Sequence, residues 1–156
     1  MSTAPQLDLA RYVPALLNFL SNKLSSGASQ CYRKHFGIGV VEWRMLSMLA
    51  VESGITANRI CQVIGLDKSA VSRSLQALEV AGRVRTEVDP ADGRRYTVSL
   101  TESGVQLYNR VLMVALERER RLLSGLSSAE VDTLINLLGR LNSQVSHVND
   151  YDPENP

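Results

Sequence analysis

The sequence has little of what metal proteins, secreted proteins and membrane proteins require. It contains two cysteines in 156 residues, and Cys31 and Cys61 form no Cys-x-x-Cys pair. His35 and His147 are isolated and do not stand at metal-ligand spacing from the cysteines, so we expect no metal and no cofactor. No apolar run approaches the ~20 residues that span a bilayer, and the first residues lack the pattern of a secretory leader. We therefore expect a cytoplasmic protein with no membrane partner.

The sequence also lacks the arrangements that enzymes use. It has no Ser/His/Asp ordering, no paired carboxylates on one face and no glycine-rich phosphate loop, so we predict no catalytic residues and no enzyme activity. The formal net charge is +1, which excludes a basic field over the whole surface. Any nucleic-acid interface must therefore be local. The length suits a single domain with a sizeable core.

What the sequence does contain is a series of helical patterns. Apolar residues at helical spacing predict a long amphipathic helix from about Leu7 to His35. Pro14 either kinks this helix or marks where a shorter N-terminal piece ends. The stretch "VVEWRMLSMLAVES", from Val40, is apolar nearly all round and predicts a buried helix that stops at Gly54.

Two shorter helices with clear start signals follow. Thr56 is a natural N-cap for "ANRICQVI", which ends at Gly65. Asp67 caps "KSAVSRSLQALEVA", which ends at Gly82. The connection "IGLD" is the kind of glycine-containing turn that joins two helices at a steep angle, so we predict a helix-turn-helix.

Two alternating stretches then predict a β-hairpin. "RVRTEV" and "RYTVSL" have the period of two that is typical of half-buried strands, and the second places Tyr96, Val98 and Leu100 on one face. We expect "DPADG" to form a long, charged tip between the strands, with Gly93 allowing it to turn tightly.

Two further helices complete the pattern. Thr101 is the expected cap of a long helix that reaches about Ser124. Ser127, with Glu130 three residues on, predicts a capping box for the last helix. That helix carries one apolar stripe, made of Val131, Leu134, Ile135, Leu138, Leu141 and Val145.

The helix after Asp67 has the features of a recognition helix. The residues expected to face inward are Ala70, Val71, Leu75 and Leu78. The residues left facing outward are small, polar or basic, and we predict that they bind DNA: Lys68, Ser69, Ser72, Arg73 and Gln76. An arginine can pair bidentately with guanine O6 and N7, and a glutamine can pair with adenine. The same face also fits an ordinary solvated helix surface.

The hairpin favours the DNA-binding interpretation. Arg94, near its tip, can reach a narrow minor groove, where negative potential is concentrated. We expect Asp92 to orient the Arg94 guanidinium through a bidentate salt bridge, because a carboxylate that faced phosphates would be repelled.

Three stretches resemble the MarR family of bacterial transcriptional regulators: "FGIGVVEWRMLSMLA", "LDKSAVSRSLQALEVAGRV" and the wing signature "DPADGRRYTVSLTESG". The chain departs from the family at Gly93, where arginine is common. The resemblance implies a mainly α fold with a small β-hairpin wing, a winged helix-turn-helix flanked by N- and C-terminal dimerisation helices. We expect one domain over residues 1–156, with dimerisation helices at about 1–36 and 101–148, a DNA-binding part at about 40–100 and a frayed tail at 149–156.

The resemblance further implies a homodimer that binds double-stranded DNA at a pseudo-palindromic operator and acts as a repressor. It implies release by a small aromatic carboxylate or phenolic effector bound between the dimerisation and DNA-binding parts. An arginine near a tryptophan suits an aromatic acid. The predicted ligand-binding residues are Arg11, Asn18, Asn22, Ser25, Ser29, Trp43, Arg44 and Met48.

Two alternatives remain open. One is a redox-responsive regulator acting through Cys31, whose thiol pKa the nearby Arg33, Lys34 and His35 would lower. The simpler interpretation is that both cysteines are small buried residues that only contribute to packing. The other alternative is a winged-helix module that binds proteins and not DNA; the exposed Arg73 and Arg94 argue against it.

Overall fold

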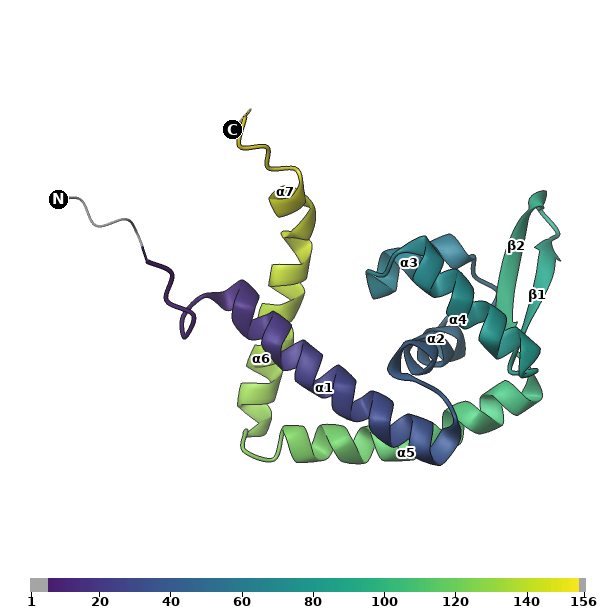
Figure 1. Cartoon of the computed structure of the whole chain (residues 1–156), viewed down its shortest axis with the longest axis horizontal. Helices are drawn as coiled ribbons and strands as arrows, with labels where there is room; N and C mark the ends of the chain where they lie inside the picture. Colours follow the sequence, from purple (N-terminus) through teal and green to yellow (C-terminus); the bar gives the residue numbers. More distant parts are fainter. Residues whose placement is uncertain (1–5, 155–156) are drawn as a thin grey trace. The chain divides into compact units, whose positions relative to one another are not determined.

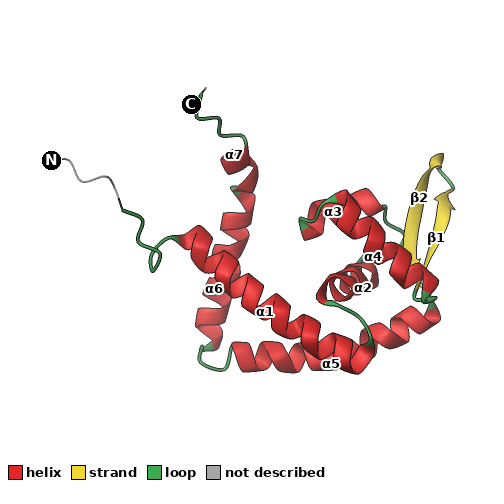
Figure 2. Cartoon of the chain, viewed as in Figure 1, coloured by secondary structure: helices red, strands yellow, loops and turns green. Residues whose placement is uncertain are grey.

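The computed structural model describes residues 6–154 and is mainly helical, with a two-stranded hairpin (Figures 1 and 2). The predicted segments 1–36 and 149–156 include residues 1–5 and 155–156, which lie outside the described residues. The elements in chain order are α1 (Val13–Phe36), α2 (Val40–Val51), α3 (Ala57–Ile64), α4 (Lys68–Val80), β1 (Val84–Asp89), β2 (Asp92–Leu100), α5 (Glu102–Leu122), α6 (Ser128–Ser143) and α7 (Val145–Asn149). This confirms the predicted fold class.

The chain divides into two compact units, the first ending at Met113 and the second beginning at Val114. The boundary lies inside α5, so the first turns of this helix belong to the unit that contains α1 to β2. None of the helices within residues 6–154 combines the length and the apolar character needed to cross a membrane.

The first helix begins at Val13, so the predicted start near Leu7 was wrong. The chain before it forms a turn in which the Tyr12 N–H donates to the Asp8 carbonyl at 2.9 Å. Pro14 occupies the first helical turn, where its missing N–H costs no intrahelical hydrogen bond. Pro14 therefore stands where the N-terminal turn ends and the helix begins, and not within a longer helix.

The second helix is the centre of the first unit. It contacts α1, α3, α4 and β2, and its Met45, Leu46 and Leu49 are almost completely buried. Burying one such side chain stabilises the fold by roughly 1.5–3 kcal/mol. The other elements contribute core residues that surround it: Ile60, Val71, Leu78, Val84, Val98, Leu107 and Val111. The predicted buried helix is thereby confirmed.

The helix-turn-helix forms as its caps predict. The Thr56 hydroxyl accepts the Arg59 N–H at 3.2 Å at the start of α3, and the Asp67 carboxylate accepts the Ala70 N–H at 2.9 Å at the start of α4. Gly65 ends α3 with φ +73°, a left-handed conformation that a side chain would strain. Two adjacent helices are thus ended and restarted within three residues.

The hairpin tip is shorter than predicted. The strands pair antiparallel as far as Asp89 and Asp92, so only Pro90 and Ala91 connect them, and "DPADG" is not a long loop. The Asp89 carboxylate accepts the Ala91 N–H at 2.9 Å, which satisfies a turn donor locally. A register shift after Val88 accommodates the tight connection.

Gly93 does not make the turn that we expected of it. It lies within β2, and in residues 6–154 a positive φ occurs only at Gly37, Gly54, Gly65 and Gly82. The register shift and the Asp89 turn reverse the chain without left-handed backbone at this position.

The base of the hairpin, and not its whole predicted face, is buried. Val98 is 3% exposed, whereas Tyr96, on the same predicted face, is 58% exposed. At the base, the Val98 N–H donates to the Ile55 carbonyl at 2.8 Å, and the Gly54 N–H donates to the Val98 carbonyl at 3.1 Å. The loop between α2 and α3 therefore holds β2, while the outer half of the hairpin stands clear of α2, α3 and α4 (Figure 1).

The second unit contains the end of α5, then α6 and α7. α5 ends at Leu122, close to the predicted Ser124, and Ser127 and Glu130 form the predicted capping box. The Ser127 N–H and hydroxyl donate to Glu130 and lower the pKa of its carboxyl. The last predicted helix breaks at Gln144, so its apolar stripe continues from α6 into α7.

Candidate nucleic-acid interface

The exposed face of α4 is the one that the sequence predicted. Val71 and Leu78 are buried and Ala70 and Leu75 half-buried, which confirms the inward face. All the outward residues are exposed: Lys68, Ser69, Ser72, Arg73 and Gln76. Lys68 and Ser69 occupy the first positions of the helix, where free backbone N–H groups and the helix dipole favour a phosphate.

The wing presents a second exposed cation, but the predicted Asp92–Arg94 salt bridge is absent from the described residues. The Asp92 carboxylate instead accepts the backbone N–H of Arg94 at 3.1 Å, and its other oxygen lies 4.0 Å from the Nε of Arg95. The physical reason is that a short aspartate side chain reaches the N–H two residues on more easily than a long guanidinium. The Arg94 guanidinium is therefore positioned by the strand and not by a carboxylate.

Internal carboxylates neutralise several cations of the first unit. Arg59 binds Glu52 through two hydrogen bonds of 3.1 and 2.9 Å, which lower the pKa of the Glu52 carboxyl. On β1, the Nε of Arg85 lies 3.2 Å from Glu87. The positive charge of these two guanidiniums is therefore partly offset by a carboxylate of the chain itself.

The cations of the recognition face and the wing tip have no such partners. Within the part of the chain that the structure describes, the side chains of Lys68, Arg73 and Arg94 form no ion pair or hydrogen bond, and all three are exposed. The exposed face of α4 and the hairpin thus present three unpaired cations, although the chain as a whole is almost neutral.

The predicted ligand residues are only partly brought together. The Nη2 of Arg44 donates to the Ser25 hydroxyl at 2.8 Å, so one predicted pair connects α2 to α1. The Ser29 hydroxyl accepts the Val40 N–H at 3.2 Å and therefore holds the start of α2. Met48 is buried in the core, and three of the predicted residues are exposed along the first part of the chain: Arg11, Asn18 and Asn22.

Trp43 belongs to an aromatic cluster. Its ring stacks on Tyr108 with centroids 5.6 Å apart, and it meets the edge of Tyr32 at 5.9 Å. The cluster joins α1, α2 and the first turns of α5, and it accounts for Trp43 without a ligand.

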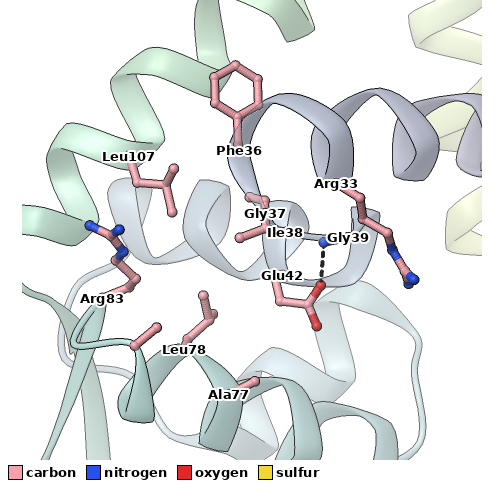
Figure 3. A pocket seen from close by; sticks show the side chains of 11 residues that line it. Arg33, Phe36, Gly37, Ile38, Gly39, Glu42, Ala77, Leu78, Arg83 and Leu107 are labelled. Carbon is pink, nitrogen blue, oxygen red and sulfur yellow. Dashed lines mark hydrogen bonds between the residues drawn. The ribbon is translucent and has the colours of Figure 1, made fainter.

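A cleft that the sequence did not predict lies between the end of α1, the start of α2 and the end of α4. It has a volume of about 400 Å³ and, among the described residues, none of the predicted ligand residues lines it. Ile38, Leu78 and Leu107 point toward one another, with Arg83 on one side and Glu42 on the other (Figure 3). The Gly39 N–H donates to Glu42 at 2.8 Å. The glycines flanking Ile38 were the only sequence signal for this junction.

The fold and the site define a class of protein. A helix-turn-helix followed by a two-stranded hairpin, with free cations on the second helix and at the hairpin tip, is a winged helix-turn-helix of the DNA-binding type.

Comparison with known proteins identifies the family. A family model described as the MarR family matches residues 36–95. The crystal structure of a MarR/EmrR family transcriptional regulator from Acinetobacter sp. ADP1 is 38% identical, with 90% of this chain and 99% of that chain covered and a TM-score of 0.85. The chain belongs to the MarR family of transcriptional regulators.

Two further relatives are informative. A Thauera aromatica protein named as a regulatory protein for the hcr operon is 31% identical over 102 residues, 65% of this chain and 61% of that protein. The chain thus spans about three fifths of this curated relative. The S. aureus MepR–DNA complex is 26% identical, with 89% of this chain and 99% of that chain covered and a TM-score of 0.77.

Proposed function

We propose that the chain is a homodimeric, sequence-specific DNA-binding repressor that a small aromatic carboxylate or phenol releases from its operator. The single observation that carries DNA binding is the set of three unpaired, exposed cations, Lys68, Arg73 and Arg94, on α4 and the wing. The MepR–DNA complex supports the proposal, because a relative of the same fold is bound to DNA there.

Each side chain has a role that its chemistry fits. Arg73 enters the major groove and pairs with guanine O6 and N7, while Gln76 pairs with adenine. Lys68 and the free N–H groups at the start of α4 hold a phosphate. Ser69 and Ser72 contact base edges or phosphates, and Arg94 occupies the adjacent minor groove.

A second copy of the chain supplies the dimer. Large apolar side chains of α1 are one third to one half exposed, and they follow one another at helical spacing: Val13, Leu16, Leu17, Leu20 and Leu24. The second unit exposes an apolar stripe of its own, including Leu134, Leu138 and Leu141. Large apolar side chains exposed in a row along a helix are typical of an interface between proteins. A two-fold dimer would present its recognition helices about one DNA turn, ~34 Å, apart.

The effector part of the proposal is supported by one contact. Arg44 and Ser25 connect α2 to α1, and Trp43, next to Arg44 on α2, stacks on Tyr108 of α5. A carboxylate that drew Arg44 away from Ser25 would act on the junction between the N-terminal helix and the winged helix. Such a ligand shifts the equilibrium only by its difference in affinity for the two arrangements.

The DNA upstream of the protein's own gene provides the test of binding. We expect the wild type to bind it with an affinity that falls steeply with salt, because phosphate contacts release counterions. Reversing the charge at both Arg73 and Arg94 should abolish binding, whereas Arg140→Glu, which changes charge on α6, should retain it. Intact binding by the double charge-reversal variant, or a flat salt response, would refute the proposed interface.

A ligand screen tests the effector. Benzoate and hydroxybenzoates should raise the melting temperature and weaken operator binding, and Arg44→Gln should reduce both responses. No response to any aromatic acid, together with a peroxide response that Cys31→Ser abolishes, would replace this effector proposal with the redox mechanism.

A further inference from the structure

Two hydroxyl groups at the N-terminal end of α5, those of Thr101 and Ser103, bind the backbone where the recognition helix ends. Gly82 follows the last residues of α4 with φ +68°, and its carbonyl accepts the Thr101 hydroxyl at 2.6 Å and the Ser103 hydroxyl at 2.9 Å. A carbonyl oxygen has two lone pairs, so both are used. A glycine after a helix is a position where the backbone bends at little cost, and here it is fastened to another element.

The backbone next to Gly82 is held by further hydrogen bonds. The Arg83 N–H donates to the Leu78 carbonyl at 2.8 Å, and the Thr101 N–H donates to the Arg83 carbonyl at 3.0 Å. The Nη1 of Arg83 donates to the Ser103 carbonyl at 3.3 Å. Gly104 lies so close to Arg83 that a side chain on it would overlap the Arg83 carbonyl.

These contacts exceed what the start of a helix needs. Thr101 already caps α5 by accepting the Gly104 N–H at 3.1 Å, and its own hydrogen is donated outward to Gly82. Ser103 does not cap α5, yet its hydroxyl also reaches Gly82. The arrangement therefore joins the end of α4 and the start of β1 to the first turn of α5, a helix that continues without a break to Leu122.

We propose that Thr101 and Ser103 are positioning residues that fix the angle of the recognition helix and wing to α5, and thereby set which half-site spacing the dimer accepts. The inference rests on the proposed function as a dimeric DNA-binding protein. The winged helix is connected along the chain to the other elements at two points, Gly37–Gly39 before α2 and Thr101 after β2. The second connection is the one that these hydroxyls stiffen.

The test uses the full chain and three DNA duplexes: the natural operator, the same operator with one base pair inserted at its centre, and a single half-site. The insertion rotates one half-site by about 35° and moves it by about 3.4 Å. The variants are Ser103→Ala, which leaves the α5 cap intact, the double change Thr101→Val with Ser103→Ala, and Thr101→Ser, which retains the hydroxyl.

We expect the wild type to bind the inserted operator at least about tenfold more weakly than the natural one. In the double variant this penalty should fall to about threefold or less, with half-site affinity within about twofold of the wild type. Ser103→Ala should lie between them, and Thr101→Ser should behave as the wild type.

Unchanged discrimination between the two operators in the double variant and in Ser103→Ala overturns the inference while leaving the proposed function intact. Equal loss of half-site and operator binding overturns it also, since that result indicates local damage to the winged helix. A wild type that binds none of the three duplexes refutes the proposed function itself, and the inference with it.

Discussion

The arginines of the winged helix differ in whether a carboxylate of the chain binds them. Arg59 is held by Glu52 through two hydrogen bonds, while Arg73 and Arg94 have no charged partner within residues 6–154. An exposed ion pair contributes only about 0–1 kcal/mol to stability. Its main effect here is on whether the guanidinium is available to bind DNA. An unpaired guanidinium reaches a phosphate or a base without first losing a protein contact.

The charge network on α5 allows a direct check at this scale. Arg120 and Arg121 each place Nε 2.7 Å from a Glu117 oxygen and lower the pKa of its carboxyl to about 2. Because the folded-state pKa is depressed, the interaction is fully present above pH ~4.5 and is lost as the pH falls toward about 2. Carboxyl NMR titration should give a midpoint well below that of an ordinary glutamate.

Replacing Arg120 and Arg121 together with alanine should return the Glu117 midpoint to the ordinary range, and high salt should move it part of the way. A midpoint that is ordinary in the wild type would contradict the geometry of this network.

Side-chain exposure on α4 was predictable from the sequence, but side-chain pairing was not. The helical period placed Val71 and Leu78 inward and Arg73 outward, as the structure has them. The partner of Asp92 depended on a competition between a backbone N–H and a guanidinium, which residue types alone do not decide. The DNA and ligand contacts themselves remain predictions.

At the scale of elements, the sequence predicted the helix caps correctly, but it did not predict where the two strands of the hairpin meet. Thr56, Asp67 and Ser127 cap helices as predicted, because each acts within three residues of itself. The hairpin tip was predicted too long because strand ends depend on cross-strand pairing, here between Asp89 and Asp92. The cleft beside Leu78 is assembled from residues of α1, α2, α4 and α5, and the glycines flanking Ile38 are the only local signal for it.

Two helical glycines differ in the space around them, because only Gly104 lies at the contact between α5 and the start of β1. Gly104→Ala should destabilise the fold by about 1–3 kcal/mol, because the new methyl group would overlap the Arg83 carbonyl. Gly139→Ala, in α6 with open space around it, should instead stabilise by up to about 1 kcal/mol through helix propensity. Urea unfolding of the two variants measures both changes, and equal effects would contradict the described packing.

At the scale of the whole molecule, the order of elements was predictable from the sequence. What covers the exposed apolar side chains was not. Hydrophobic periodicity reports that a face is buried, and a core and an interface between copies give the same pattern. The stripe of α6 and α7 illustrates this, because Ile135 and Val145 remain 63% and 49% exposed in the chain by itself. A second copy is the occupant that we propose.

Sedimentation equilibrium tests whether a second copy of the chain covers this apolar surface. The wild type should sediment at twice the mass of the chain, and Leu20→Glu or Leu138→Glu should lower the association constant by more than about tenfold, since a charge in an apolar interface is left unpaired. Val51→Glu, at an isolated exposed position on α2, is the matched control and should remain dimeric. A monomeric wild type at micromolar concentration would contradict the dimer.

Methylation interference on the upstream DNA tests the central claim most directly, because a methyl group at guanine N7 blocks the contact proposed for Arg73 in the major groove. We predict interference at guanines in two half-sites whose centres lie about one helical turn, 10–10.5 base pairs, apart. We further predict that Arg73→Ala abolishes the interference at one symmetry-related guanine pair and leaves the others. An interference pattern identical in the wild type and Arg73→Ala would contradict the claim that this face of α4 contacts bases.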